Sequence, residues 1–300
     1  TLNSIIENRA GNHALIINRL GNMAKDYGWS IAVLADRLKE KDFDFQKGIA
    51  DEEILQKEIS KLYQVNDELS AVEKNIIEAF SIFPATPLPV DLCVEWLHED
   101  AEVDSDTCAL ILKRLAEKTW LEGKLDEADH PSFVMHLLVK TAIKKQAKAK
   151  YSAHQHLVSN CVKTLQSNSQ NNQHYSSSLH ASFATSISSE LYEPNDVFVL
   201  LDATIADHYD SILDFTSALI WYKSAIDNLE SITDEQNPTI ATLYDKIGGV
   251  YTRLGNFDSA LIWCLRALTI REEILMCNDI SIASSYNNIG MIFADQGRYD

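Results

Sequence analysis

The chain has 300 residues, a formal net charge of −18, 46% hydrophobic residues and 23% charged residues. No apolar run approaches the ~20 residues of a membrane-spanning helix, and so acidic a chain disfavours a broad nucleic-acid surface, because phosphate binding needs clustered Lys and Arg. The five cysteines are odd in number and lack CxxC spacing, so neither a disulfide framework nor a zinc site is predicted, and a cytoplasmic location is favoured.

Two helices are predicted within residues 1–68, which we expect to form a small helical domain. The first carries apolar side chains at helical spacing, namely Leu15, Ile16, Leu20, Met23 and Ala24. The second runs from about Ser30 to Lys39, and a charged stretch follows it.

Shorter elements are predicted in residues 69–150. Three helices are expected over Ala71–Ile82, Val90–Glu99 and Ser105–Lys118. A strand over "TWLEG", 119–123, a polar turn and a second strand over "SFVMH", 132–136, follow them. Three helices followed by a hairpin predict a winged-helix domain.

Residues 151–195 are polar and rich in serine, and we expect a helical connector or a degenerate repeat there. Leu179, Phe183 and Ile187 keep helical spacing, which predicts a helix preceded by a loop. A metal site needs convergent ligands held in place, and nothing in the sequence indicates one. The histidines of this segment are therefore expected at the surface: His154, His156, His174 and His180.

Residues 196–300 repeat themselves. The stretch "ALIWYKSAI", 218–226, returns 42 residues later as "ALIWCLRAL", 260–268. The same offset relates Gly248 to Gly290 and Gly255 to Gly297, and the apolar residues of each unit predict a helical hairpin. An earlier unit is degenerate, with Ala206 at the Gly248 position and Leu213 at the Gly255 position, and the last unit is truncated.

The repeat pattern resembles the tetratricopeptide repeat, and its long period resembles the variety found in kinesin light chains. The resemblance implies an α-solenoid whose first helices bind a protein or peptide partner. The implied contact positions in the second unit are Asp245, Lys246, Gly249, Thr252 and Arg253. Those in the third unit are Asn287, Asn288, Met291 and Ala294.

The order of the three regions resembles the C-terminal part of bacterial NB-ARC-type STAND proteins, which are nucleotide-switched signalling ATPases. "GNHALII" lies where that family places a residue near adenine, and the residue here is Ala14. "VMH" lies where the family has a histidine that reaches the β-phosphate of ADP, which is His136 here, although Leu137 replaces the family's aspartate. In the intact protein the resemblance implies ADP or ATP as cofactor and an upstream nucleotide-binding domain as partner.

We expect no catalysis in this segment, because no GxxxxGK[ST] loop occurs to cradle phosphates. The chain begins without Met and stops inside a repeat, so we expect it to be part of a longer protein. The sequence predicts a mainly helical chain: a helical domain, a winged helix with a small hairpin, and an α-solenoid.

Other functions stay open. A transcription regulator would bind DNA through Ser105–Lys118, yet that helix offers only Lys113, Arg114 and Lys118 against Asp106 and Glu117. A plain tetratricopeptide-repeat adaptor would use the first half only to cap the repeats. A hydrolase is the weakest alternative, since no nucleophile-elbow or metal-ligand spacing occurs.

Overall fold

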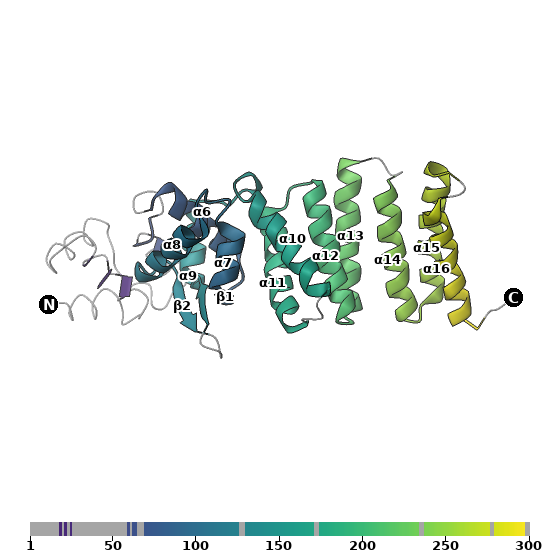
Figure 1. Ribbon diagram of the computed structural model, residues 1–300, viewed down its shortest axis with the longest axis horizontal. Helices are drawn as coiled ribbons and strands as arrows, with labels where there is room; N and C mark the ends of the chain where they lie inside the picture. The colour runs from purple at the N-terminus through teal and green to yellow at the C-terminus, as the bar shows by residue number, and fades with distance from the viewer. Residues whose placement is uncertain are drawn as a thin grey trace. The chain divides into compact units, whose positions relative to one another are not determined.

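The computed structural model describes single positions between 18 and 64 and the ranges 69–125, 130–170, 174–233, 237–276 and 279–297. It divides into two compact units, Thr1–Asn160 and Cys161–Asp300. The predicted mainly helical fold, with a small antiparallel sheet and a helical solenoid, is confirmed (Figure 1).

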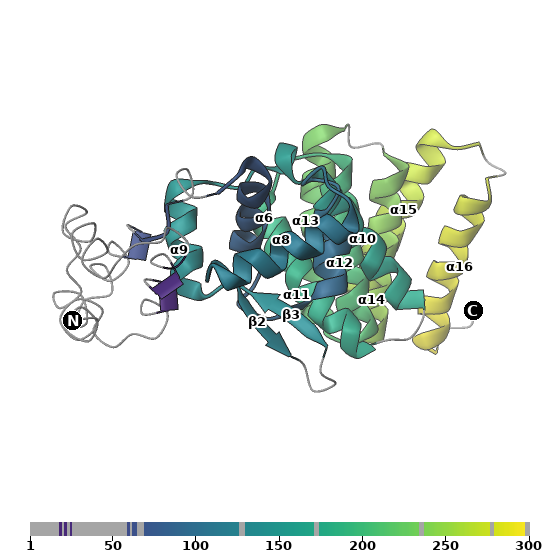
Figure 2. The same cartoon turned by 60° about the vertical axis from the view of Figure 1, so that its left-hand side comes forward.

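In the first unit, the described residues between 69 and 146 form four α-helices and a three-stranded sheet. The helices are α6 (Ala71–Ile82), α7 (Val90–Leu97), α8 (Ser105–Glu117) and α9 (Leu137–Gln146). The strands are β1 (Leu88–Pro89), β2 (Glu122–Leu125) and β3 (Pro131–Val134). They pair antiparallel in the order β1-β3-β2, and β2 and β3 form a hairpin that extends from the helices (Figure 2).

Helix boundaries in this unit follow the capping residues. Ser70 and Glu73 form a capping box at the start of α6, and Asp104 caps α8 by accepting from the Thr107 amide. Ala71–Ile82 is a helix with the predicted bounds, whereas α7 and α8 end two residues and one residue earlier than predicted.

The predicted strand over 119–123 was wrong at its start. Thr119 has a positive φ of 62°, which turns the chain sharply after α8. Trp120 and Leu121 then lie buried in the core, and pairing begins only at Glu122. The second strand is shifted in the opposite direction: it begins one residue earlier than predicted and ends at Val134 instead of His136.

The core of the first unit is aromatic. The Phe83 ring lies edge-on to Phe80 and to Trp96, with centroid distances of 5.3 and 6.2 Å. Cys93 and Cys108 are fully buried free thiols, and burial raises the pKa of Cys108 to about 11. Such protonated, enclosed thiols pack as small apolar groups.

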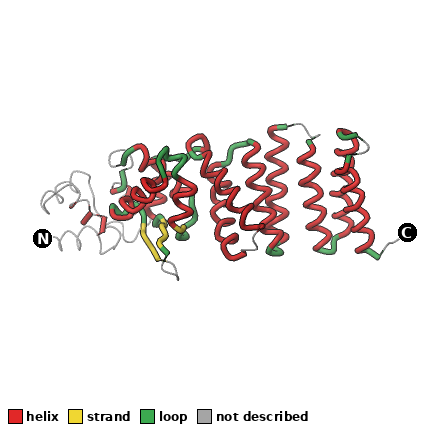
Figure 3. Tube along the Cα trace, in the orientation of Figure 1, coloured by secondary structure: helices red, strands yellow, loops and turns green. Residues whose placement is uncertain are grey.

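The second unit is a succession of helices, which Figure 3 draws in red. Its helices are α10 (Gln155–Gln170, which begins in the first unit after the 3-10 turn Tyr151–Ala153), α11 (His174–Leu191), α12 (Asp196–Ser211), α13 (Phe215–Ile232), α14 (Pro238–Arg253), α15 (Phe257–Ile274) and α16 (Ile280–Asp295).

Two expectations for residues 151–195 need correction. The predicted helix through Phe183 and Ile187 exists as α11, but α10, which the sequence did not predict, precedes it. His154 and His180 are buried, with 0% and 6% exposure, instead of lying at the surface. Burial is the main cause that lowers the pKa of both imidazoles, because a low-dielectric interior disfavours the charged form.

The 42-residue period reappears in the backbone. Asn195, Asn237 and Asp279 cap the starts of α12, α14 and α16, and each accepts a hydrogen bond from an amide in the first turn. Asp214 and Asn256 do the same for α13 and α15. Identical capping positions fix each helix to the same register in successive units.

The turn after the first helix of each unit uses the left-handed conformation. Leu213, Gly255 and Gly297 occupy the same position in the three units, and their φ angles are 64°, 71° and 72°. Glycine adopts this conformation without a steric penalty, whereas Leu213 does not. The degenerate first unit therefore keeps the turn geometry without the residue that suits it.

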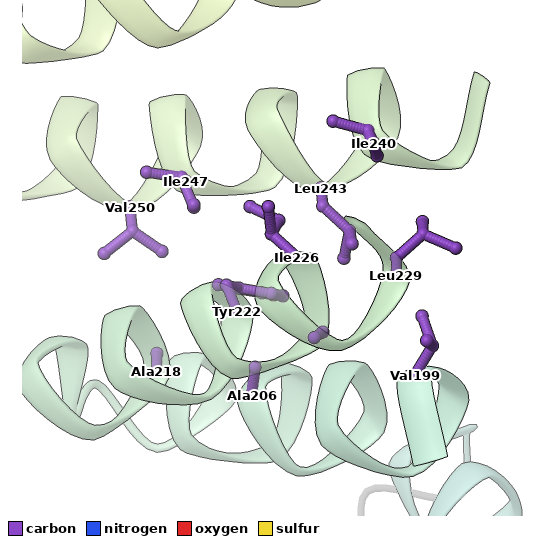
Figure 4. Close-up of a cluster of buried hydrophobic side chains, with 11 residues drawn as sticks. Val199, Ala206, Ala218, Tyr222, Ile226, Leu229, Ile240, Leu243, Ile247 and Val250 are labelled. Atoms are coloured by element: carbon purple, nitrogen blue, oxygen red, sulfur yellow. The ribbon is translucent and has the colours of Figure 1, made fainter. Parts of the chain in front are cut away.

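The core of the second unit lies between α12, α13 and α14. Figure 4 shows Tyr222, Ile226 and Leu229 of α13 between apolar side chains of α12 and α14. A second cluster joins Ala260 and Cys264 of α15 to Ile292 of α16. Each helix pair thus buries one apolar face against the next pair, as solenoid repeats require.

Candidate partner-binding surface and nucleotide site

The first helices of successive units, α12, α14 and α16, carry the predicted partner contacts. Ion pairs join α12 to α14 directly, so these two helices are neighbours. We call the following side chains of the three helices the first-helix surface: Asp207, Asp210, Lys246, Arg253, Asn287 and Met291.

Lys246 is held by the preceding unit. Its Nζ lies 2.5 Å from Asp207 Oδ1, and the Tyr222 hydroxyl donates to the same oxygen at 2.5 Å. Burial, followed by the Asp207 charge, raises the pKa of Tyr222, so the phenol stays protonated as the donor. The Lys246 ammonium is 5.8 Å from the centre of the Tyr222 ring.

Arg253 makes the second connection between the same helices. Its Nη2 contacts both carboxylate oxygens of Asp210 at 2.5 Å, and its guanidinium lies 5.8 Å from the centre of the Phe215 ring. The Thr252 hydroxyl donates to the Gly248 carbonyl of its own helix at 3.0 Å. These predicted contact residues therefore already have partners within the chain.

Asp245 does not lie open to a partner. It forms an ion pair with Arg271 of α15, whose side chain is only 8% exposed, and Arg271 also donates to Ser285 of α16. The guanidinium thus joins three helices. This role is structural. The Asp245 side chain is only 13% exposed, so its exposure does not support the prediction that it faces a bound partner.

The residues of α16 differ from those of α14. Asn287 is exposed, Asn288 is half-buried, and Met291 is 51% exposed. An amide offers both a donor and an acceptor, and a thioether adapts its shape to apolar surfaces. Asn287 and Met291 are therefore the predicted positions that present side chains for contact.

Sequence analysis missed Asp207, Asp210, Tyr222 and Arg271. Asp207 and Asp210 align with Gly249 and Thr252 in the next unit, but the poor match of the first unit concealed them. Their spacing of three residues places both on one helix face, which was the available signal. Arg271 carries no such signal, because its partners belong to two other helices.

His136 caps helix α9. Its Nδ1 accepts a hydrogen bond from the Leu138 amide at 3.2 Å, and the ring is half-buried. A neutral imidazole whose Nδ1 accepts carries its proton on Nε2. Ala14, the other predicted nucleotide contact, lies outside the described residues.

Two of the three cations at the end of α8 form ion pairs with another helix. Arg114 and Lys118 form ion pairs with Glu73 of α6, at 3.1 and 3.5 Å. Burial alone would raise the pKa of Glu73, but hydrogen bonds from Ser70 and the charges of these two cations lower it. Lys113 is exposed on the same helix, together with Leu110 at 68%. This surface is mixed and partly apolar, which does not favour phosphate binding.

Within the described ranges, no three His, Cys, Asp or Glu side chains converge to hold a metal ion. The described helices include none that is long and apolar enough to cross a membrane.

The comparison with known families addresses the repeats. Residues 239–300 match the tetratricopeptide repeat. The tetratricopeptide match covers α14, α15 and α16, whose paired helices and repeated caps are described above. Tetratricopeptide repeats typically bind other proteins, so the first-helix surface is a candidate interface for a protein partner.

Two further comparisons complete this result. No curated protein matches the chain. Among solved structures, the crystal structure of BtubC (BKLC) from P. vanneervenii is similar over 77% of this chain and 86% of that one, with 16% sequence identity and a TM-score of 0.45. A likeness at this level carries no conclusion about function.

Proposed function

We propose that this chain is the regulatory and partner-sensing segment of a cytoplasmic, nucleotide-switched STAND protein. In this proposal, the tetratricopeptide repeats bind a protein or peptide through the first-helix surface. Residues 69–150 form a winged helix whose His136 holds ADP, together with an upstream nucleotide-binding domain. Catalysis belongs to that upstream domain and not to this chain.

The partner-binding proposal rests on the two ion pairs that join α12 to α14. Lys246 and Arg253 are fixed by Asp207 and Asp210 of the preceding unit before any partner arrives. A surface held in this way loses little side-chain entropy on binding. Asn287 and Met291 of α16 then supply groups that a peptide backbone and an apolar side chain can use.

Two observations support the nucleotide part. The first is the succession α6, β1, α7, α8, β2, β3 with sheet order β1-β3-β2, because three helices followed by a β-hairpin are what we expect of a winged helix. The second is the cap at α9: a neutral His136 ring whose Nδ1 accepts from the Leu138 amide carries its proton on Nε2, and an N–H group is the kind of donor that a phosphate oxygen accepts from. The N-terminus of the helix adds a favourable dipole for an anion nearby.

Partner binding is tested by selecting peptides from a displayed library on the full chain. Selected peptides should lose about tenfold or more in affinity when Asn287 and Met291 are both replaced by Ala, because about 1.4 kcal/mol corresponds to a factor of ten. Ile220→Ala with Ile262→Ala is the matched control, since both residues are exposed on the second helices, at 60% and 54%. Peptides sensitive only to the control pair would contradict the proposed surface.

The nucleotide role is tested in the protein that joins this chain to a P-loop domain. His136→Ala should speed the release of labelled ADP, because a charge-assisted hydrogen bond contributes ~1.5–3 kcal/mol. His130→Ala, an exposed histidine before β3, is the control. Equal release rates for both variants and the parent would remove His136 from the nucleotide site, without affecting the partner-binding test.

A further inference from the structure

Gly249 lies within α14, and packing inside the chain does not require a glycine there. Among the described residues, the only side-chain atoms within 4 Å of a Cβ placed on it are Arg253 Nη1 at 3.7 Å and Nη2 at 4.0 Å, which is ordinary van der Waals contact. Its neighbour Gly248 differs, because it faces Cys264 of α15 where no side chain fits. Glycine weakens a helix relative to alanine, so α14 would be more stable with alanine at position 249.

The repeat does not require this glycine either. The 42-residue offset aligns Gly249 with Asp207 of α12 and Met291 of α16, so the two neighbouring units carry side chains at this position. Both of these residues belong to the first-helix surface. Gly249 therefore gives that surface a position on α14 where the helix backbone has no side chain in front of it.

Arg253 lies one turn from Gly249 and uses only part of its hydrogen-bonding capacity. Residues four apart share a helix face, and the guanidinium lies beside the position that a Gly249 side chain would occupy. Its Nη2 contacts Asp210, whereas among the described residues Nη1 and Nε have no acceptor. A guanidinium has five N–H groups in one plane, so Nη1 can donate to a further acceptor while Nη2 stays on Asp210.

The charges around Gly249 favour a neutral acceptor. Lys246 and Arg253 are each paired with a carboxylate of α12, Asp207 and Asp210, so two anions balance the two cations. A carboxylate of a partner would also meet these anions and would gain little net attraction. A main-chain carbonyl is a neutral acceptor, and it can approach a helix closely where there is no side chain.

We propose that Gly249 admits the main chain of a bound peptide to α14, and that Arg253 Nη1 donates to one of the carbonyl oxygens of that peptide. We call Gly249 and Arg253 together the main-chain docking point. This inference rests on the proposed function, because the peptide is the partner of the first-helix surface. It adds a specific chemistry, since an extended segment is recognised here through its backbone and not through a side chain.

The test uses peptides selected on the full chain from a displayed library without Asp and Glu, then synthesised with amidated C-termini so that they carry no carboxylate. Peptides that lose affinity when Asn287 and Met291 are both replaced by Ala are taken forward. Gly249→Ala should weaken their binding about fivefold or more, because the methyl group keeps the peptide main chain away from the helix. Gly249→Leu should weaken it further.

Stability separates a binding role of Gly249 from a structural one. Gly249→Ala should raise the urea midpoint, because alanine is the better helix former and its methyl group has room. Gly290→Ala is the matched control on α16, where no atom of the described residues lies within 4 Å of the added Cβ, and it should raise the midpoint without changing affinity. A lower midpoint in Gly249→Ala would show that the glycine is structural and would overturn the proposal.

Arg253 is tested by Arg253→Lys, which keeps a positive charge beside Asp210 but removes the Nη1 and Nε donors. Affinity for the same peptides should fall about tenfold, because a hydrogen bond from a charged donor is lost. Arg266→Lys is the control and should leave affinity unchanged. Arg266 is exposed on α15, and its guanidinium lies 4.9 Å from the centre of the Trp263 ring.

Three further outcomes would count against the main-chain docking point. Peptides that depend on Asn287 and Met291 but bind equally to Gly249→Leu and Arg253→Lys would overturn it and leave the proposed function standing. If only peptides from a second library that contains Asp and Glu were sensitive to Arg253→Lys, the site would recognise a carboxylate, and the main-chain contact would be wrong. If no selected peptide depended on Asn287 and Met291, the proposed partner surface would fail, and the main-chain docking point with it.

Discussion

Gly248 of α14 lies directly against Cys264 of α15, with no room for a side chain between them. A Cβ atom placed on Gly248 would come 2.5 Å from the Cys264 sulfur and 3.3 Å from the Ala260 carbonyl oxygen. The close approach of α14 and α15 therefore requires that position 248 has no side chain. Gly290, its equivalent in α16, has no atom within 4 Å of such a Cβ.

The first prediction compares these two glycines. Gly248→Ala should destabilise the second unit by about 1–3 kcal/mol, because overpacking forces the helices apart. Gly290→Ala should be neutral or stabilising by up to about 1 kcal/mol, since alanine is the better helix former. The urea midpoint, followed by far-ultraviolet circular dichroism, measures both, and equal losses would contradict the steric explanation.

The second prediction concerns Leu213. Its φ of 64° is unfavourable for a side chain, and its side chain is 67% exposed, so little burial is lost on its removal. Leu213→Gly should therefore stabilise the chain by about 1 kcal/mol. Gly255→Leu should destabilise it by a similar amount or more. Thermal unfolding of both variants checks the pair, and a destabilised Leu213→Gly would show that the leucine has a packing role.

The third prediction addresses the ion pair of Arg271 and Asp245. Arg271→Met leaves a carboxylate that is 13% exposed without its cation, which should cost about 3–5 kcal/mol of stability. Replacing Asp245 by Leu in the same chain should recover part of this loss, because no unpaired charge remains. A double-mutant cycle in urea measures the coupling, and additive losses would mean that the pair contributes no interaction energy.

The fourth prediction is a loss of stability in acid. Burial, and then the neighbouring His208, lower the pKa of His180 below its ordinary value of 6.5. The unfolded chain then binds a proton before the folded chain does, so stability falls as the pH drops below 6.5 towards the folded-state pKa. Urea midpoints at pH 7.5 and 5.5 should differ less in His180→Gln than in the parent. The exposed His130→Gln should keep the full difference.

Much of the second unit could be predicted from the sequence. The 42-residue offset placed Leu213, Gly255 and Gly297 at one position, and all three have left-handed backbones. Helical spacing and capping residues are local properties, because each depends on neighbours within about four positions along the chain. The match of residues 239–300 to the tetratricopeptide repeat agrees with that prediction.

Tertiary structure decided whether the predicted contact residues were already paired within the chain. Lys246 pairs with a carboxylate 39 residues away, and Arg253 with one 43 residues away, both on the helix of the preceding unit. The sequence placed these cations correctly on α14 but did not show that they were already paired. Whether a surface side chain is available depends on which helix packs beside it, and one helix cannot specify its neighbour's side chains.

Burial was also decided by tertiary structure. The sequence determined that 151–195 could form a helix, yet His154 and His180 become buried only when other segments cover them. In the same way, the turn at Thr119 places Trp120 in the core, where Arg19 reaches it across 101 positions of sequence. Local sequence determines the helix, its caps and its turns, whereas contacts between distant segments determine which polar groups lose access to water, because desolvation depends on everything packed around a group.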